Sequence, residues 1–141
     1  QREHKEQNQM NFIFLGKRIL VVEDHPLNIE VATRLLEKRG FVVHQASNGQ
    51  EALEMFIRSQ ENYYQVILMD IRMPILDGLE ATAKIRSLDR EDAQSIPIIA
   101  MTANAFDLDK ELSKQAGMNA HLAKPIEPAK LFETLREYLD L

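Results

Sequence analysis

Short apolar runs alternate with amphipathic stretches along the chain from Arg18 to its C-terminal end. The apolar runs have the length of strands, and the stretches between them repeat apolar residues at the three- and four-residue spacing of a helix. The expected strands are Arg18–Val22, Phe41–Ala46, Gln65–Asp70, Ile96–Met101 and Asn119–Ala123. Strands that alternate with helices are typical of an α/β domain with a parallel sheet. The pattern therefore predicts a doubly wound (βα)5 sandwich with helices on both faces of the sheet.

Residues at the predicted helix ends support this interpretation. The first helix is expected from about Pro26 to Arg39, because proline suits an opening turn and Gly40 follows the last turn. Asn48 and Glu51 form the pattern of a capping box for the second helix, although Asn48-Gly49 could instead signal a hairpin turn. The further helices are expected at about 78–87, 105–116 and 128–139, and the polar stretch Asp89–Ser95 is expected to be a connecting loop.

The N-terminal end differs from the rest of the chain. Residues 1–9 are polar without periodicity, and they lead into a short apolar patch that Gly16 closes. We interpret residues 1–16 as a linker or the end of an upstream region, and residues 17–141 as one domain. The chain begins with Gln1 rather than Met, which suggests a piece of something larger.

Composition excludes several classes of function. The chain has 141 residues, a formal net charge of -5 and no run of Lys or Arg, so direct nucleic-acid binding by this segment is not expected. It has no cysteine, which excludes disulfides, thiolate zinc sites and cysteine nucleophiles. The histidines are scattered without the spacing of a zinc site: His4, His25, His44 and His121. No apolar stretch approaches the length of a membrane span, so no membrane contact by this segment is expected.

Reactive polar residues end or follow four of the five predicted strands. These residues are Glu23 with Asp24, Asp70, Thr102, and Lys124 followed by Pro125. The carboxyl ends of parallel strands meet at one edge of the sheet, called the rim below, and doubly wound folds place their active sites there. Three carboxylates, a hydroxyl and an ammonium would then share one pocket. Such a group suits a divalent cation and a phosphoryl group.

Crowded carboxylates need compensation. Two of them about 4 Å apart repel by roughly 4 kcal/mol at an effective dielectric near 20, so either a proton or a cation must neutralise Glu23, Asp24 and Asp70. Oxygen ligands without His or Cys favour Mg²⁺ or Mn²⁺. An Asp beside such an ion can attack phosphorus, while Lys124 and Thr102 can stabilise the phosphoryl oxygens. Each residue alone also has a plainer interpretation, as a helix cap, a turn residue or a solvated side chain.

Four motifs in combination resemble the receiver, or response-regulator, domain of two-component phosphorelays, over roughly residues 17–141. They are Val22-Glu23-Asp24, Met69-Asp70-Ile71-Arg72-Met73-Pro74 with Asp77-Gly78, Met101-Thr102-Ala103-Asn104-Ala105, and Leu122-Ala123-Lys124-Pro125. The resemblance implies a flavodoxin-like, CheY-like sheet in the order 2-1-3-4-5. It also implies a usually cis bond between Lys124 and Pro125.

The same resemblance implies roles for single residues. Asp70 is the expected phosphoacceptor, and Thr102 and Lys124 are expected to contact the phosphoryl group. The expected Mg²⁺ ligands are the side chains of Glu23, Asp24 and Asp70 and the backbone carbonyl of Arg72, with Mn²⁺ as a substitute ion.

Further positions either depart from the family pattern or modulate the site. Glu23 stands where the family usually has Asp, and His121 stands where its switch residue is usually Tyr or Phe. His121 would follow Thr102 inward on phosphorylation. Arg72 and Asn104 correspond to positions that flank the path of the hydrolytic water, so we expect them to modulate the lifetime of the acyl phosphate.

The resemblance also implies partners. The chain would take a phosphoryl group from a histidine kinase or a histidine phosphotransfer domain and signal through the face formed by the fourth helix, fifth strand and last helix. The C-terminal receiver of a hybrid histidine kinase suits the linker-like start, and a stand-alone receiver is the alternative. A cytoplasmic location is expected, even within a membrane-anchored parent, and a weak homodimer is a further expectation.

Three rivals remain open on sequence alone. An aspartyl phosphatase shares the Asp nucleophile and magnesium, but it generally has a second acid where this chain has Arg72. A flavin or nucleotide binder needs a glycine-rich or hydroxyl-rich loop after the first strand, whereas this loop is acidic. A degenerate receiver that serves only for docking would keep the fold without the chemistry.

Overall fold

Five parallel strands form one sheet in the order β2-β1-β3-β4-β5, as expected. The structure is a computed structural model that describes residues 14–103 and 110–139. The strands are β1 (Arg18–Val22), β2 (Val42–Ala46), β3 (Val66–Asp70), β4 (Ile98–Thr102) and β5 (Ala120–Ala123). β1 has its predicted bounds, and the other four strands differ from theirs by one or two residues at their ends. The predicted fold class is confirmed.

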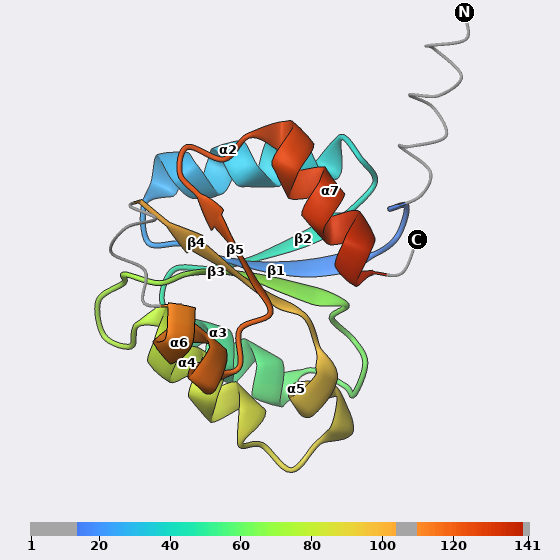
Figure 1. The fold of residues 1–141 in the computed structure, drawn as a ribbon. Helices are drawn as coiled ribbons and strands as arrows, with labels where there is room; N and C mark the ends of the chain where they lie inside the picture. The colour runs from blue at the N-terminus through green and yellow to red at the C-terminus, as the bar shows by residue number, and fades with distance from the viewer. Residues whose placement is uncertain (1–13, 104–109, 140–141) are drawn as a thin grey trace, which may run out of the picture.

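Helices cover both faces of this sheet (Figure 1). They are α2 (Pro26–Glu37), α3 (Gly49–Arg58), α4 (Gly78–Arg86), α5 (Glu91–Ser95), α6 (Lys110–Ala116) and α7 (Pro128–Tyr138). In Figure 1, α2 and α7 lie on one face, and α3, α4, α5 and α6 lie on the other. The chain therefore winds to both sides of the sheet.

Central strand β3 contributes to two hydrophobic cores. Val66 and Leu68 pack in the core under α2 and α7, whereas Ile67 and Met69 pack in the core under α3 and α4. All four side chains are fully buried. This two-sided burial explains why the strand is a continuous apolar run rather than an alternating one.

Capping side chains fix two helix starts. The side chain of Asn48 accepts a hydrogen bond of 2.8 Å from the backbone N–H of Glu51, and Asp77 does the same for Glu80. Each bond satisfies one backbone donor that the first helical turn leaves unpaired. The helix after Asn48 is therefore confirmed, and the alternative of a hairpin turn is wrong.

The stretch Asp89–Ser95 contains helix α5, so the prediction of a plain loop there is wrong. Polar side chains of this stretch contact other parts of the domain and do not simply face water. Asp92 is buried and forms an ion pair of 2.8 Å with Arg90, and Ala93 is fully buried. These contacts order a five-residue helix that shows no periodicity in the sequence. Of the helix expected at 105–116, the start lies outside the described residues and the remainder is α6.

No helix in the described part of the chain combines the length and the apolar character needed to span a membrane.

Candidate active site

The rim brings together side chains from three strand ends. The Lys124 ammonium lies 2.7 Å from a carboxylate oxygen of Glu23 and 2.9 Å from one of Asp70. These residues follow or end β5, β1 and β3. Glu23 and Asp70 are buried, and the Lys124 side chain is 18% exposed. One ammonium therefore joins two buried carboxylates.

Backbone hydrogen bonds that continue the sheet hold these positions. The N–H of Glu23 donates to the carbonyl of Ala46 at 3.1 Å, and the N–H of Lys124 donates to the carbonyl of Thr102 at 2.8 Å. Consequently the side chains project from a rigid edge rather than from free loops. The Lys124–Pro125 peptide bond is cis, as the resemblance implied.

Three carboxylates form one cluster. One oxygen each from Glu23, Asp24 and Asp70 lies within 4.8 Å of the other two. Asp24 is exposed at the mouth of the cluster, and the other two are buried. An all-oxygen set of this kind fits a hard divalent cation such as Mg²⁺.

Asp70 carries an unfavourable charge. Burial, with a smaller contribution from the neighbouring Glu23 carboxylate, raises the pKa of Asp70 to about 6 against the opposing hydrogen bond from Lys124. Among the described residues, the rim thus carries more negative charge than the Lys124 ammonium balances. Added positive charge would stabilise it.

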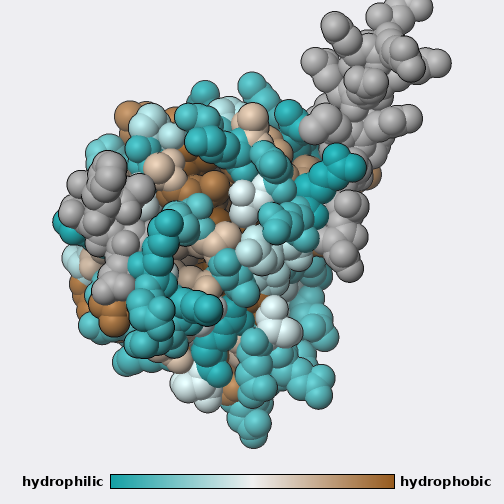
Figure 2. All heavy atoms as spheres, viewed as in Figure 1, coloured by the Kyte–Doolittle hydropathy of each residue, from teal (hydrophilic) through white to brown (hydrophobic). Residues whose placement is uncertain are grey.

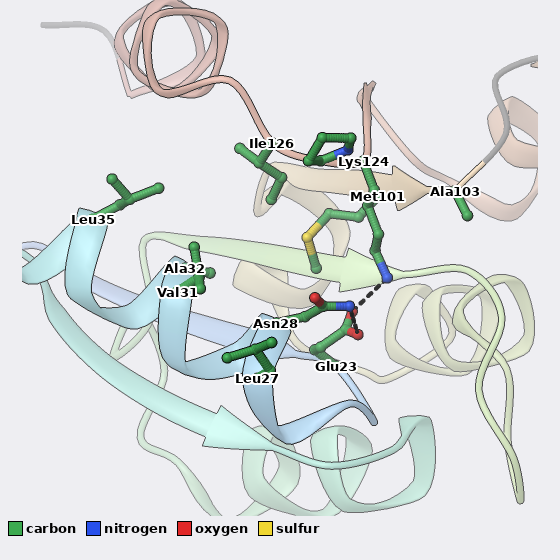
Figure 3. Close-up of a pocket in the computed structure, with 11 residues that line it drawn as sticks. Glu23, Leu27, Asn28, Val31, Ala32, Leu35, Met101, Ala103, Lys124 and Ile126 are labelled. Carbon is green, nitrogen blue, oxygen red and sulfur yellow. Dashed lines mark hydrogen bonds and ion pairs between the residues drawn. The ribbon is translucent and has the colours of Figure 1, made fainter.

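Hydrogen bonds stabilise the charged form of Glu23 more than that of Asp70. Burial by itself raises the pKa of Glu23, but hydrogen bonds from Lys124 and Asn28 outweigh burial, and the pKa lies below its usual value. The Asn28 amide donates to Glu23 at 3.0 Å, and Figure 3 draws both bonds. Burial opposes the charge of Lys124, but the two carboxylates raise its pKa, so the ammonium stays protonated.

Gly78 allows α4 to start directly against the phosphoacceptor candidate. A Cβ atom at this position would lie 2.1 Å from the carbonyl oxygen of Asp70. The N–H of Gly78 also donates to the carbonyl of Ile71 at 2.8 Å. The loop after β3 is therefore tied back to the strand end from which it starts.

The other expected site residues lie around this centre. Thr102 ends β4 and is 7% exposed, whereas Arg72 is exposed in the loop after β3. His121 is exposed on β5, with Ala100 as its neighbour in the register. Asn104 lies outside the described residues. The roles expected for these four residues stay predictions.

A hollow beside the rim was not foreseen. It has a volume of about 470 Å³ and lies between α2 and the segment after β5. Figure 2 shows hydrophobic atoms at its floor, and Figure 3 shows Leu27, Val31 and Ile126 around it. Leu27 and Val31 are 61% and 50% exposed, four residues apart on one helix. Apolar residues that lie off the buried stripe of a helix are the sequence signal that could have found this surface.

Comparison with known proteins identifies the family. Residues 19–136 match the model of the response regulator receiver domain. The chain belongs to this family. Hybrid signal transduction histidine kinase I of Dictyostelium discoideum is 42% identical over 123 residues, which cover 86% of this chain but only 7% of that protein. The polar-differentiation response regulator DivK of Brucella ovis is 37% identical over 125 residues, covering 89% of this chain and 98% of DivK.

Solved receiver structures have the same fold. The receiver domain of sensor histidine kinase PA1611 from Pseudomonas aeruginosa is 41% identical, with a TM-score of 0.80 and coverage of 89% of this chain and 99% of that one. That domain has a magnesium ion coordinated in its active-site cleft. The Saccharomyces cerevisiae receiver of Ssk1, solved with the histidine phosphotransfer protein Ypd1, is 28% identical with a TM-score of 0.76, covering 89% and 90% of the two chains. This chain is thus a receiver domain of two-component signalling.

Proposed function

We propose that Asp70 accepts a phosphoryl group from a phosphohistidine in a Mg²⁺-dependent reaction. The observation that carries the proposal is the position of Asp70: it is buried at the end of β3, in contact with the Lys124 ammonium and clustered with two further carboxylates. A nucleophilic carboxylate, a fixed cation and an oxygen-ligand set are the parts that phosphoryl transfer to an aspartate requires.

The site would hold the metal ion through four oxygen ligands. These are the side chains of Glu23, Asp24 and Asp70 and the backbone carbonyl of Arg72, and Mn²⁺ could substitute because it accepts similar ligands. When bound, the ion supplies positive charge that neutralises the incoming phosphoryl oxygens. The magnesium in the cleft of the PA1611 receiver supports this proposal.

The chain's own residues carry the transfer. A carboxylate oxygen of Asp70 attacks phosphorus, and the bond between phosphorus and the imidazole nitrogen breaks, leaving its electron pair on the nitrogen. The added phosphoryl charge draws the Lys124 ammonium away from Glu23, which lies 2.7 Å from it before transfer. Thr102 donates its hydroxyl hydrogen to another phosphoryl oxygen.

A shift of Thr102 and Lys124 on phosphorylation can change the packing of the neighbouring face of the domain. Both residues adjoin the face formed by α6, β5 and α7, where we expect the output partner to bind. His121 on β5 would act as the aromatic switch that follows Thr102. A small displacement at the phosphoryl group is thereby converted into a choice between two packings of this face.

The hollow along α2 fits a phosphohistidine-bearing partner. Leu27 and Val31 expose apolar surface beside Glu23 and Lys124, so a partner that reaches Asp70 also covers them. The complex of the Ssk1 receiver with Ypd1 supports a histidine phosphotransfer protein as this partner. A hybrid histidine kinase is the proposed parent protein, from which the phosphoryl group passes on to a phosphotransfer domain. A cytoplasmic location and a weak homodimer belong to the same proposal.

Incubation with acetyl phosphate and Mg²⁺, followed by intact mass measurement, tests the function. Wild type should gain the mass of one phosphoryl group, and chelation of Mg²⁺ should prevent the gain. Asp70→Asn should gain nothing. Asp77→Asn is the matched control, because it changes an acid in the same loop while keeping a good helix cap, and it should be labelled like wild type.

The outcomes separate the rival functions. No adduct on wild type would favour a receiver that serves only for docking, and an adduct retained in Asp70→Asn would exclude Asp70 as the acceptor. An aspartyl phosphatase would turn over small phosphate esters, which we do not expect, because Arg72 occupies the place of its second acid.

The lifetime of the acyl phosphate is expected to depend on Arg72 and Asn104. The Arg72 guanidinium can pair with the phosphoryl oxygens or block the approach of water. Arg72→Ala should therefore change the dephosphorylation rate, measured by the decay of the mass adduct. An unchanged rate would remove Arg72 from the proposal.

A further inference from the structure

Ile75 has an unusual backbone and an unusual exposure. It lies in the loop between β3 and α4, its φ is +72°, and it is 80% exposed. The N–H of Leu76 donates to the carbonyl of Pro74 at 2.8 Å, which makes Ile75 the centre of a three-residue turn. A turn of this kind with positive φ is rare and strained, and positive φ is a genuine outlier for a β-branched residue.

The fold explains the turn. Leu76 is buried, and its carbonyl accepts a hydrogen bond of 3.0 Å from the N–H of Gly49 at the start of α3. A Cβ atom on Gly49 would lie 2.3 Å from that carbonyl oxygen, so the loop packs directly on the helix start. The chain must turn sharply before Leu76 to reach this position.

The fold does not explain the side chain at the centre of the turn. Glycine or asparagine would adopt a positive φ at lower cost than isoleucine. Because Ile75 is 80% exposed, its side chain gains little from burial within the domain. Strain and exposure together are costs that the free domain does not recover, and strain of this kind accumulates at functional sites.

We propose that Ile75 is a docking residue for the phosphohistidine-bearing domain that delivers the phosphoryl group to Asp70. This inference rests on the proposed function. Asp70 is only 4% exposed, so a donor imidazole that contacts it must bring the surrounding donor surface against the rim. The bond from Gly78 to Ile71 keeps the loop that carries Ile75 at this rim. The donor therefore covers Ile75.

Ile75 extends the contact to the second face of the sheet. Leu27 and Val31 lie on α2, on one face, whereas Ile75 precedes α4, which lies on the other (Figure 1). A donor that engages both sides is held across the rim, with its imidazole over Asp70. Because the strained turn fixes Ile75 before binding, little conformational freedom is lost when the donor binds.

Substitutions at Ile75 separate docking from chemistry. Ile75→Asn and Ile75→Gly both relieve the backbone and remove the apolar group, and Ile75→Leu keeps an apolar group. The matched control is Ile57→Gln, which removes an aliphatic side chain that is 51% exposed on α3 near the opposite edge of the sheet. Three quantities are measured for each: the urea unfolding midpoint, the labelling rate with acetyl phosphate, and kcat/KM for transfer from a phosphorylated histidine phosphotransfer domain that serves wild type.

Ile75→Asn and Ile75→Gly should unfold at the same or a higher urea concentration than wild type and react normally with acetyl phosphate. Their transfer from the phosphohistidine domain should be slower by about tenfold or more, the factor expected when most of one aliphatic side chain is no longer buried. Ile75→Leu should keep most of the transfer rate, and Ile57→Gln should match wild type in transfer and labelling.

Three other results would contradict the docking role of Ile75, the strain argument or the proposed function. Unchanged transfer in Ile75→Asn would overturn the docking role while leaving the phosphoacceptor function intact. A lower unfolding midpoint in both Ile75→Asn and Ile75→Gly would overturn the strain argument. If wild type takes no phosphoryl group from any donor, the proposed function fails, and the inference fails with it.

Discussion

Two clusters of buried charge at opposite edges of the sheet behave in opposite ways. At the rim, Glu23 and Asp70 share the single ammonium of Lys124, and the pKa of Asp70 is raised to about 6. At the other edge, before β4, Asp92 is the one carboxylate in the described part of the chain that pairs with the guanidinium of Arg90. Burial by itself raises the pKa of Asp92, but bonds from Arg90 and a backbone N–H lower it overall. Charge balance, rather than burial alone, separates the two clusters.

The guanidinium of Arg90 donates hydrogen bonds to backbone carbonyls at the C-terminal end of α3. Arg90 donates to the carbonyls of Phe56 at 2.9 Å and Ser59 at 3.0 Å, and its guanidinium lies 4.7 Å from the Phe56 ring centre. Asp92 in turn accepts a bond of 2.9 Å from the N–H of Asn62. Carbonyls at a helix end favour a cation. The charges of this cluster are balanced, which favours stability, whereas the rim keeps an excess of negative charge that the proposed function would use.

The largest change in the free energy of unfolding is expected when the ion pair between Arg90 and Asp92 is removed. Asp92→Ala removes the buried carboxylate and leaves the partly buried Arg90 guanidinium without its ion-pair partner, and we expect the free energy of unfolding to fall by about 3 kcal/mol. Urea denaturation measures this loss. The control is Glu30→Gln, which removes an exposed ion pair with Arg34 and should cost less than about 0.5 kcal/mol. Equal losses in the two variants would contradict the comparison.

The pH dependence of that loss has a definite sign. The folded pKa of Asp92 lies below its unfolded value, so its contribution is present above about pH 4 and is lost as the pH falls through the folded pKa. The difference in stability between wild type and Asp92→Ala should therefore shrink on acidification. A difference that grows below pH 4 would show that the ion pair is not its source.

At the rim, we expect a substitution to raise the free energy of unfolding, by an amount smaller than the loss in Asp92→Ala. The folded pKa of Asp70 is raised from 3.8 to about 6, so wild type loses stability as the pH rises between these values. Asp70→Asn avoids this loss and leaves Lys124 paired with Glu23. Without Mg²⁺ at pH 7, the pKa shift corresponds to about 3 kcal/mol, and the lost contact with Lys124 offsets part of it, so we expect the free energy of unfolding of the variant to be higher by about 2 kcal/mol. Urea denaturation near pH 4 should give a much smaller difference.

Added Mg²⁺ should make wild type more stable to unfolding than Asp70→Asn. An ion that binds only the folded state stabilises it in proportion to its affinity, and Asp70→Asn removes one carboxylate ligand. Wild type should therefore gain more from added Mg²⁺ than the variant does. If Asp70→Asn is the less stable protein at pH 7 even without Mg²⁺, the rim does not carry the excess charge that we describe.

The smallest effect concerns a neutral polar group away from both clusters. Thr82 on α4 is fully buried, and its hydroxyl has no hydrogen-bond partner among the residues that the structure describes. Thr82→Val keeps the shape and removes the unpaired group, so the free energy of unfolding should rise by about 1 kcal/mol. Thermal or urea denaturation checks this rise, and labelling by acetyl phosphate should stay unchanged. A loss of stability would indicate that the hydroxyl has a partner after all.

The fold and the centre of the site were predictable because they depend on local patterns. Apolar runs fix the strands, and in a parallel sheet the residues after them must meet at one edge. This reasoning brings Glu23, Asp70 and Lys124 together without any coordinates. It does not predict that Lys124 contacts both carboxylates, because that depends on how long side chains pack at the edge.

Features that depend on distant contacts were missed. Arg90 and Asp92 appear in the sequence as part of a polar loop. The bonds that order α5 join Arg90 to Phe56 at the end of α3 and Asp92 to Asn62 just after it, about thirty residues earlier. The positive φ of Ile75 follows from the burial of Leu76 against Gly49, which lies on another helix. Neither contact leaves a periodic or motif signal in the nearby sequence.

The bond between Glu23 and Lys124 joins residues 101 positions apart in the chain. It can form only when the first strand and the last strand have both entered the sheet. A chain that stops before β5, or one whose last strand has not yet docked, therefore lacks the Lys124 ammonium at the rim, which the proposed phosphoryl transfer uses. Under the proposed function, acceptance of a phosphoryl group then depends on a sheet that is complete from β1 to β5, so a copy without β5 in place takes no phosphoryl group.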